Sequence, residues 1–323
     1  MSWRFVGLKV LGALATLLFV IIFNFFLFRV VENDPVGTLV RGRNLTEEQQ
    51  QRLAEDFGVD QPLPEQFRRY IVETAQLNLG ISFETREPVW DVIKGKIWPT
   101  VFLVGTAAVL SAVIGTIIGI FAAWRRGSAT DYVGTGSTML LYSMPDFWLG
   151  LLLLVLLADT FALFPTSGIT DPGSDATGLS SLLDQAHHMF LPGLTLMLAY
   201  LGEYAIIMRS SLLETMGEDY LVLARAKGLR DTLVRRRHAV PNALLPLVTL
   251  IAINFGFVLS GAIAVEAIYS WPGLGLATAN AIRAPDLPML QGLFLVFSAA
   301  VILANLLADL LYAYLDPRVG ARA

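Results

Sequence analysis

Six long apolar stretches, separated by polar segments, dominate the amino-acid sequence. Each contains at most one Asp, Glu, Lys or Arg, and together they cover residues 10–28, 97–124, 132–158, 185–208, 238–265 and 287–308. A membrane-spanning helix needs about 20 mostly apolar residues, since each helical residue rises about 1.5 Å through a hydrocarbon core of about 30 Å. The pattern therefore predicts an all-α membrane protein with six transmembrane helices.

The first apolar stretch has two interpretations, because Arg4 and Lys9 precede it as basic residues precede a secretory signal. The stretch is longer than the apolar core of such signals, which is about 7–15 residues. The Phe-Leu-Phe-Arg-Val-Val that ends it lacks the small residues of a cleavage site. We therefore expect residues 1–31 to form a retained transmembrane helix.

Basic residues in the short loops and at the termini gather at alternate junctions and predict the orientation of the chain. They are Arg4, Lys9, Arg125, Arg126, Arg209, Arg225, Lys227, Arg230, Arg235, Arg236, Arg237, Arg318 and Arg322. Arg283 and the eight basic residues of 32–98 lie on the opposite side, the latter in a segment longer than the loops to which the positive-inside rule applies. Residues 159–189, by contrast, carry four Asp and no Lys or Arg. The positive-inside rule therefore predicts that both termini and the loop after the fourth stretch are cytoplasmic.

Residues 32–96 are expected to form a small helical element on the opposite side. Residues 46–49 have the Thr-x-x-Gln spacing of a capping box, and Gly58 can end the short helix that it opens. A second helix is expected after Pro62. Trp90, Ile93 and Ile97 then share a helical face beside lysines, which favours an interfacial helix before the second stretch.

Composition narrows the class further. Hydrophobic residues make up 55% of the chain and charged residues 15%, against about 25% charged in soluble domains, and the mean hydropathy is +0.61. A net charge of −4 argues against a nucleic-acid partner. The absence of Cys excludes disulfides, thiolate metal sites and thiol nucleophiles.

The loop at residues 211–241 is the most organised polar segment. Residues 211–227 are rich in helix formers, Gly228 can stop that helix in the left-handed conformation, and Asp231 is placed to cap a second helix. An apolar stripe is expected at Leu213, Met216, Tyr220, Leu223 and Ala224. The pattern fits a docking corner for a soluble partner, and it equally fits a helix lying on anionic lipid.

A family resemblance favours the docking corner. Residues 218–228 read Glu-Asp-Tyr-Leu-Val-Leu-Ala-Arg-Ala-Lys-Gly, and residues 241–246 read Pro-Asn-Ala-Leu-Leu-Pro. Together they resemble the "EAA" loop of binding-protein-dependent ABC importer permeases. Segments that agree in order and spacing occur at residues 58–64, 143–150, 164–168, 191–196, 270–275 and 309–317. Over nearly the whole chain, the sequence is similar to the first permease of the oligopeptide/dipeptide/nickel group.

The resemblance implies a type I (MetI-like) permease fold in a bacterial inner membrane. It also implies a peptide importer in which the chain forms half of the translocation pathway. The implied partners are a second homologous permease, two ABC ATPase subunits, an extracytoplasmic substrate-binding protein and the lipid bilayer. No G-x-x-x-x-G-K-[ST] phosphate cradle occurs in the sequence, so we expect no enzyme activity and no cofactor here, with ATP and Mg²⁺ bound by the partner subunits.

By the same resemblance, the loop inserts into a groove on an ATPase subunit. The residues assigned to this contact are Glu218, Asp219, Tyr220, Ala224, Arg225, Ala226, Lys227, Gly228 and Leu229. Small Ala224 and Ala226 would permit close approach, and the charged residues would pair across the interface. The alternative is a solvated helix pair without a partner.

Four residues inside or beside the apolar stretches are candidates for the pathway or a gate. Asp146 follows Pro145, which breaks its stretch, and an intramembrane carboxylate is a functional candidate. Glu203 lies within two turns of Arg209, so a pair between them is one option, and a structural role for Glu203 is favoured over one in the pathway. Trp271 is expected to anchor a tight re-entrant turn at the membrane interface. With three His and no Cys, we expect no metal site.

The expected domains are a transmembrane helix at 1–31, an extracytoplasmic helical loop at 32–96 and a transmembrane domain at 97–315 that contains the coupling loop 211–241. Gly115 and Gly119 are expected to form a helix-packing notch within that domain. The alternative substrates are nickel or another small solute. A secondary transporter is a weaker alternative, because only one Pro-broken stretch and no matching repeat are visible.

Overall fold

The computed structural model describes residues 3–31, 61–173, 177–258 and 262–315, and the regular elements in these ranges are helices. They are α1 (Trp3–Val31), α4 (Leu63–Ala75), α5 (Val89–Trp124), α6 (Ala129–Tyr142), α7 (Asp146–Leu153), α8 (Leu179–Thr215), α9 (Asp219–Ala226), α10 (Asp231–Val234), α11 (Val240–Ala243), α12 (Leu245–Phe257), α13 (Ile263–Ile268), α14 (Leu274–Arg283) and α15 (Leu287–Leu315). Two π-helical segments, Leu154–Thr160 and Arg235–Ala239, continue α7 and α10. The capping box at residues 46–49 and Gly58 lie outside the described residues.

Within the described ranges, four helices are long and apolar enough to cross a membrane: α1, α5, α8 and α15. Helix α6 and the segment Asp146–Thr160 meet the same criterion only as a pair, bent by 101° at residues 143–145, and give a fifth span if the pair is counted as one. The bend agrees with the expected effect of Pro145, which breaks the stretch over 132–158. The stretch at 238–265 is likewise not one long helix in the described residues, since α11, α12 and α13 divide it.

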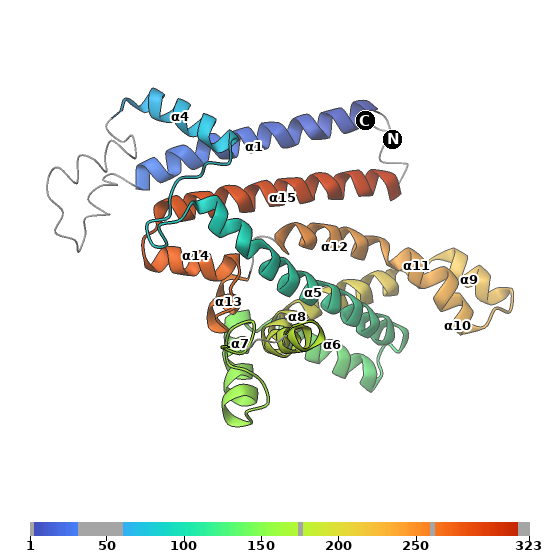
Figure 1. Ribbon diagram of the computed structural model, residues 1–323. Helices are drawn as coiled ribbons and strands as arrows, with labels where there is room; N and C mark the ends of the chain where they lie inside the picture. The colour runs from blue at the N-terminus through green and yellow to red at the C-terminus, as the bar shows by residue number, and fades with distance from the viewer. Residues whose placement is uncertain (1–2, 32–60, 174–176, 259–261, 316–323) are drawn as a thin grey trace.

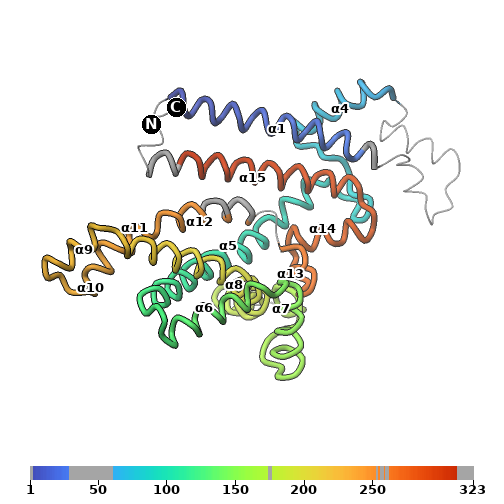
Figure 2. The backbone as a smooth tube through the Cα atoms, turned by 180° about the vertical axis from the view of Figure 1, so that it is seen from behind, coloured from blue at the N-terminus to red at the C-terminus, as the bar shows by residue number. Residues whose placement is uncertain are grey.

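The long helices lie side by side around α5 and α8 (Figures 1 and 2). Helix α1 packs along α15 at one edge of the molecule, while α12 lies between α15 and α8. The start of α1, the end of α15 and the α5–α6 junction point to the same end of the molecule as α9 and α10, which project beyond the other helices (Figure 1). Helices α4, α13 and α14 lie toward the opposite end.

A buried asparagine fastens α1 to its neighbours. The Asn24 side chain donates hydrogen bonds to the Gln291 carbonyl of α15, at 3.2 Å, and to the Tyr70 hydroxyl of α4, at 3.0 Å. Burial raises the pKa of the Tyr70 hydroxyl, which therefore stays protonated. Residues 63–75 form the second helix that was expected after Pro62.

The expected interfacial helix is in fact the first part of α5. Ile93 is fully buried, and Trp90 and Ile97 pack against the cluster that it forms with residues of α14 and α15. The same apolar face that predicted a membrane-surface helix therefore contacts the protein itself. Helix α5 continues from there without interruption through Pro99 to Trp124.

Gly115 and Gly119 form the predicted packing notch, and it receives α8. A Cβ atom added at Gly115 would lie 2.7 Å from the Leu201 carbonyl oxygen, and one added at Gly119 would lie 2.7 Å from the Cβ of Met208. Such distances are shorter than van der Waals contact, so only glycine permits this approach of the two backbones.

We expect Gly119→Ala to lower the free energy of unfolding by about 1–3 kcal/mol, because the added methyl group overpacks the α5–α8 contact. The matched control is Gly136→Ala on α6, where an added Cβ meets nothing within 4 Å. Unfolding of the purified protein in mixed micelles measures both variants. An equal effect of the two substitutions would contradict the proposed role of the notch.

Candidate functional site

The corner between α8 and α11 has the helix–glycine–helix form that the sequence predicts. Gly228 follows α9 and adopts a positive φ of +78°, so the expected left-handed stop is confirmed. Two details differ. The helix expected over 211–227 is broken between Thr215 and Asp219, and Arg230 rather than Asp231 occupies the position before α10. The Asp231 carboxylate instead lies 3.6 Å from the Arg225 guanidinium, which links the two short helices.

One face of α9 belongs to the core of this chain. Leu221 and Ala224 are buried in a cluster with Leu212, Val234, Ala239, Ala243 and Leu247, and Leu229 packs against it. Ala224 therefore does not lie on a free surface, which corrects its expected role in close approach to a partner. Ala226 is exposed. The corner is thus fixed to α8, α11 and α12 by apolar contacts.

The opposite face of α9 is exposed and partly apolar. Tyr220, Val222 and Leu223 are exposed by 41%, 57% and 56%. The expected stripe is therefore wrong in part, because two of its members, Tyr220 and Leu223, face away from the cluster that contains Ala224. The charged candidates on the corner are also exposed: Glu218, Asp219, Arg225 and Lys227. The exposed face combines apolar side chains with charges of both signs.

Arg209 pairs with Asp131 and not with Glu203. Its Nε and Nη2 atoms donate to the two carboxylate oxygens at 2.7 and 2.9 Å, with the Asp131 side chain 5% exposed and Arg209 28%. Asp131 also accepts from the Gly127 amide and the Thr135 hydroxyl. The pair joins the end of α8 to the start of α6, next to the corner. The sequence does not reveal this ion pair, because Asp131 precedes Arg209 by 78 residues.

Glu203 faces α12. Its carboxylate accepts a hydrogen bond of 3.0 Å from the Asn254 side chain, which also donates to the Tyr204 hydroxyl at 3.2 Å. Asp146 is the first residue of α7, directly after Pro145 and the bend, and is partly exposed. The structure does not bring Asp146 and Glu203 into contact with the corner. Their pathway role stays a prediction.

The turn between α13 and α14 is built around buried polar groups. Glu266 is fully buried and accepts from the Thr100 hydroxyl at 2.9 Å and from the Gly275 and Leu276 amides at 2.8 and 3.1 Å. Thr100 in turn accepts from the Leu274 amide at 2.7 Å. A Cβ at Gly273 would overlap the Glu266 carboxylate and the Thr100 hydroxyl, so the turn requires glycine there. The start of α14 is thereby fixed to α5.

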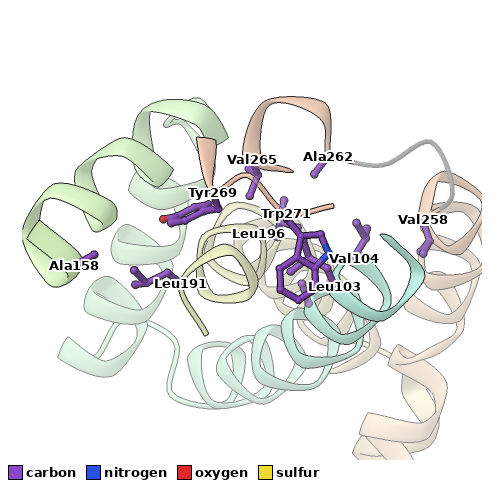
Figure 3. Packing of buried hydrophobic residues seen from close by; sticks show 11 residues of the cluster. Leu103, Val104, Ala158, Leu191, Leu196, Val258, Ala262, Val265, Tyr269 and Trp271 are labelled. Carbon is purple, nitrogen blue, oxygen red and sulfur yellow. The ribbon is translucent and has the colours of Figure 1, made fainter. Parts of the chain in front are cut away.

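Trp271 belongs to the core and is not an interfacial anchor. Its side chain is fully buried, and its indole nitrogen donates to the Pro99 carbonyl of α5 at 2.9 Å. Figure 3 shows the indole ring against α5, with Tyr269 directed toward α7. The Tyr269 hydroxyl donates to the Gly150 carbonyl at 2.9 Å. A tryptophan beside a Pro-Gly turn predicted an interface position, but the turn folds back between α5 and α7.

Comparisons with known proteins place these features in a family. Residues 115–321 match the family model of the "binding-protein-dependent transport system inner membrane component", and residues 2–104 match the N-terminal model of the same kind of component. The chain belongs to this family. Family membership makes it a multi-pass permease component of a bacterial inner-membrane transport system, within an ABC importer complex.

The relatives cover almost the whole chain. The dipeptide transport system permease protein DppB of Escherichia coli is 35% identical over 94% of this chain and 95% of its own. A putative peptide permease protein of Brucella ovis is 36% identical over 97% and 96%. The glutathione transport system permease protein GsiC of Pectobacterium atrosepticum is 34% identical over 96% and 97%.

A solved structure confirms the expected fold. The MetNI methionine ABC transporter, in an inward-facing conformation, contains a chain that matches with a TM-score of 0.52 at 15% identity, over 70% of this chain and 96% of that one. The fold is that of a type I ABC importer permease, as the resemblance implied.

We expect Asp131→Asn to lower the free energy of unfolding by about 3 kcal/mol, because it leaves Arg209 partly buried without its counter-charge. The control is Asp309→Asn, which breaks the exposed Lys9–Asp309 pair and should cost less than about 1 kcal/mol. Adding Arg209→Met to Asp131→Asn should recover part of the loss. Equal losses in the two single variants would contradict the assignment.

We expect Thr100→Val to destabilise the protein by about 1–3 kcal/mol, since Val keeps the shape but leaves the Leu274 amide and Glu266 without their shared hydroxyl. Thr278→Val is the control, because among the described residues that hydroxyl donates to the Leu274 carbonyl of its own helix. Melting temperatures of the purified variants compare the two. If Thr278→Val melted at the lower temperature, the bridging role of Thr100 would be wrong.

Proposed function

We propose that this chain is a permease subunit of an ATP-driven peptide importer and forms half of the translocation pathway. The strongest support is that relatives named for dipeptide, peptide and glutathione transport match this chain over almost its whole length. Dipeptides and glutathione share a peptide backbone with charged ends, so short peptides are the substrate class on which these names agree.

The α9–α10 corner is the surface that we assign to an ATPase subunit. It projects at the end of α8 (Figure 1), exposes Tyr220, Val222 and Leu223, and is fixed to α8 by the buried face of α9. Force applied to the exposed face would therefore be transmitted to α8 rather than absorbed by a loose loop. ATP and Mg²⁺ bind to the ATPase subunits, and hydrolysis occurs there and not in this chain.

The remaining partners complete the proposed assembly. A second homologous permease supplies the other half of the pathway, a second ATPase subunit contacts that permease, and an extracytoplasmic binding protein delivers the solute. In this arrangement the corner, the start of α1 and the end of α15 are cytoplasmic, since they share one end of the molecule and the basic loops favour that side. Asp146 and Glu203 are assigned to the pathway as its polar groups within apolar surroundings.

Uptake by the reconstituted complex tests both substrate and coupling. Proteoliposomes that contain the complex and its binding protein should accumulate a labelled dipeptide only when ATP is enclosed with the ATPase subunits. Parallel uptake assays with labelled glutathione and with Ni²⁺ test the other candidate substrates. Accumulation of Ni²⁺ without any dipeptide would overturn the peptide assignment, and uptake without the ATPase subunits would favour a secondary transporter.

We expect Gly228→Val to reduce ATP-driven uptake by about tenfold, because a β-branched residue strains the left-handed corner by about 1–2 kcal/mol and changes its angle. The matched control is Gly173→Val between α7 and α8. That glycine has a similar φ of +77° and equally open surroundings, so its replacement carries a similar strain and should leave uptake within about twofold. Equal uptake by the two variants would remove the corner from the coupling mechanism.

A further inference from the structure

Three side chains that can bind a metal meet near the start of α8, at the other end of this helix from the corner. Asp184 and His188 lie one turn apart on α8, and Asp171 comes from the connection between α7 and α8. One carboxylate oxygen from each Asp and one ring nitrogen of His188 all lie within 4.8 Å of one another. None of the segments that carry the family resemblance contains Asp171, Asp184 or His188.

The orientation of His188 leaves one nitrogen directed at a carboxylate. Its side chain is 2% exposed, and Nδ1 lies 3.0 Å from both the backbone carbonyl oxygen and the carboxylate Oδ1 of Asp184, to either of which it can donate. In the neutral tautomer that makes this hydrogen bond, the ring proton is on Nδ1 and Nε2 carries a lone pair. Nε2 lies 3.6 Å from an Asp171 carboxylate oxygen, beyond hydrogen-bond distance. Two electron-pair donors therefore face each other, an arrangement that a cation between them stabilises.

The 3.6 Å separation suits a metal ion. Zinc bonds of about 2.0–2.2 Å to nitrogen and oxygen, arranged tetrahedrally, separate neighbouring ligand atoms by about 3.4 Å. Metal-bound histidines usually donate the other ring N–H to a carbonyl or carboxylate, as Nδ1 can here. The Asp184 carboxylate, whose side chain is 14% exposed, completes the set, since one of its oxygens lies within 4.8 Å of a ligand atom of each of the other two residues.

The loop that carries Asp171 is held in place by other contacts. The Asp171 amide donates to the Asp184 carboxylate at 3.1 Å. Phe164 stacks on Phe190 of α8 with ring centroids 4.2 Å apart, and the Gly168 amide donates to the Tyr269 carbonyl at 3.0 Å. The three ligands are thus positioned by the fold rather than by the ion, which lowers the entropic cost of binding.

We propose that Asp171, Asp184 and His188 bind one divalent transition-metal ion, with Zn²⁺ as the best match to one imidazole and two carboxylates. Three protein ligands leave a position for water. The hard cations Mg²⁺ and Ca²⁺ prefer sites made of oxygen ligands only. The ion fastens the α7–α8 connection to α8. This site does not depend on which solute the protein transports, and it revises the expectation of no metal site, which considered histidines and cysteines without these carboxylates.

Zinc binding to the full-length chain, purified in detergent with its co-purifying subunits and without nucleotide, tests the site. Titration calorimetry at neutral pH should show that the wild type binds one more Zn²⁺ per copy of this chain than His188→Gln or Asp171→Asn does. If the variants bind the same number of ions, their affinity for Zn²⁺ at this site should be at least about tenfold lower than that of the wild type. Zn²⁺ should also raise the melting temperature of the wild type more than that of Asp171→Asn. Mg²⁺ should do neither.

The matched control is His187→Ala, which removes the neighbouring histidine and should bind Zn²⁺ as the wild type does. The Asp171 side chain is 73% exposed, so the Asp171→Asn variant should fold normally. It therefore still tests the site if the His188→Gln variant fails to fold. Equal zinc binding by the wild type and both ligand variants would place the bound metal elsewhere. Absence of zinc binding in the wild type would show that the three side chains contact one another without holding a metal ion. Either result overturns the proposal.

Discussion

The contact between α5 and α8 is the constraint on which the other parts of the molecule depend. In a membrane the hydrophobic effect does not drive helices together, so close backbone approach and internal hydrogen bonds must do so. Gly115 and Gly119 permit that approach. With α8 fixed against α5, Thr195 lies beside Tyr269, Glu203 beside Asn254 and Arg209 beside Asp131, so that the end of α13, α12 and α6 each receive a polar contact from the same helix.

Each of these contacts answers the same physical problem. A polar group among apolar helices is costly unless it is hydrogen-bonded, and here each charged example has one partner distant in sequence and two nearby. Glu266 is surrounded by a hydroxyl and two amides, and Asp131 by a guanidinium, an amide and a hydroxyl. The breaks in the apolar stretches make such partners available, because a helix that ends exposes amides that a continuous helix uses internally.

Local patterns in the sequence predict the local features well. The long apolar runs predict α1, α5, α8 and α15, Pro145 predicts the bend between α6 and α7, and Gly228 predicts the corner. Patterns fail where the neighbour of a residue is decided by tertiary packing. An apolar face looks the same whether lipid or protein covers it, which is why Trp271 and the first turns of α5 were assigned to the membrane interface. Arg209 has Glu203 nearby in sequence, yet the folded chain offers it Asp131. The exposed face of α9 is an intermediate case, since its amphipathic pattern is visible but its orientation depends on the cluster around Leu221.

Helix α8 has 37 residues, a length of about 55 Å at about 1.5 Å per residue. Helices α6 and α7 form a bent pair, whereas α8, like α5 with its 36 residues, is continuous. The glycine notch meets α8 around Ala205, nearer to the corner than the middle of the helix is. Tilting α8 by about 10° about the notch moves its corner end by about 3 Å and its start by about 7 Å in the opposite direction. The helix thus has the mechanics of a lever with the α9–α10 corner on the short arm and the Asp171–Asp184–His188 cluster on the long arm, so that a displacement at the corner is enlarged and reversed in direction at the cluster.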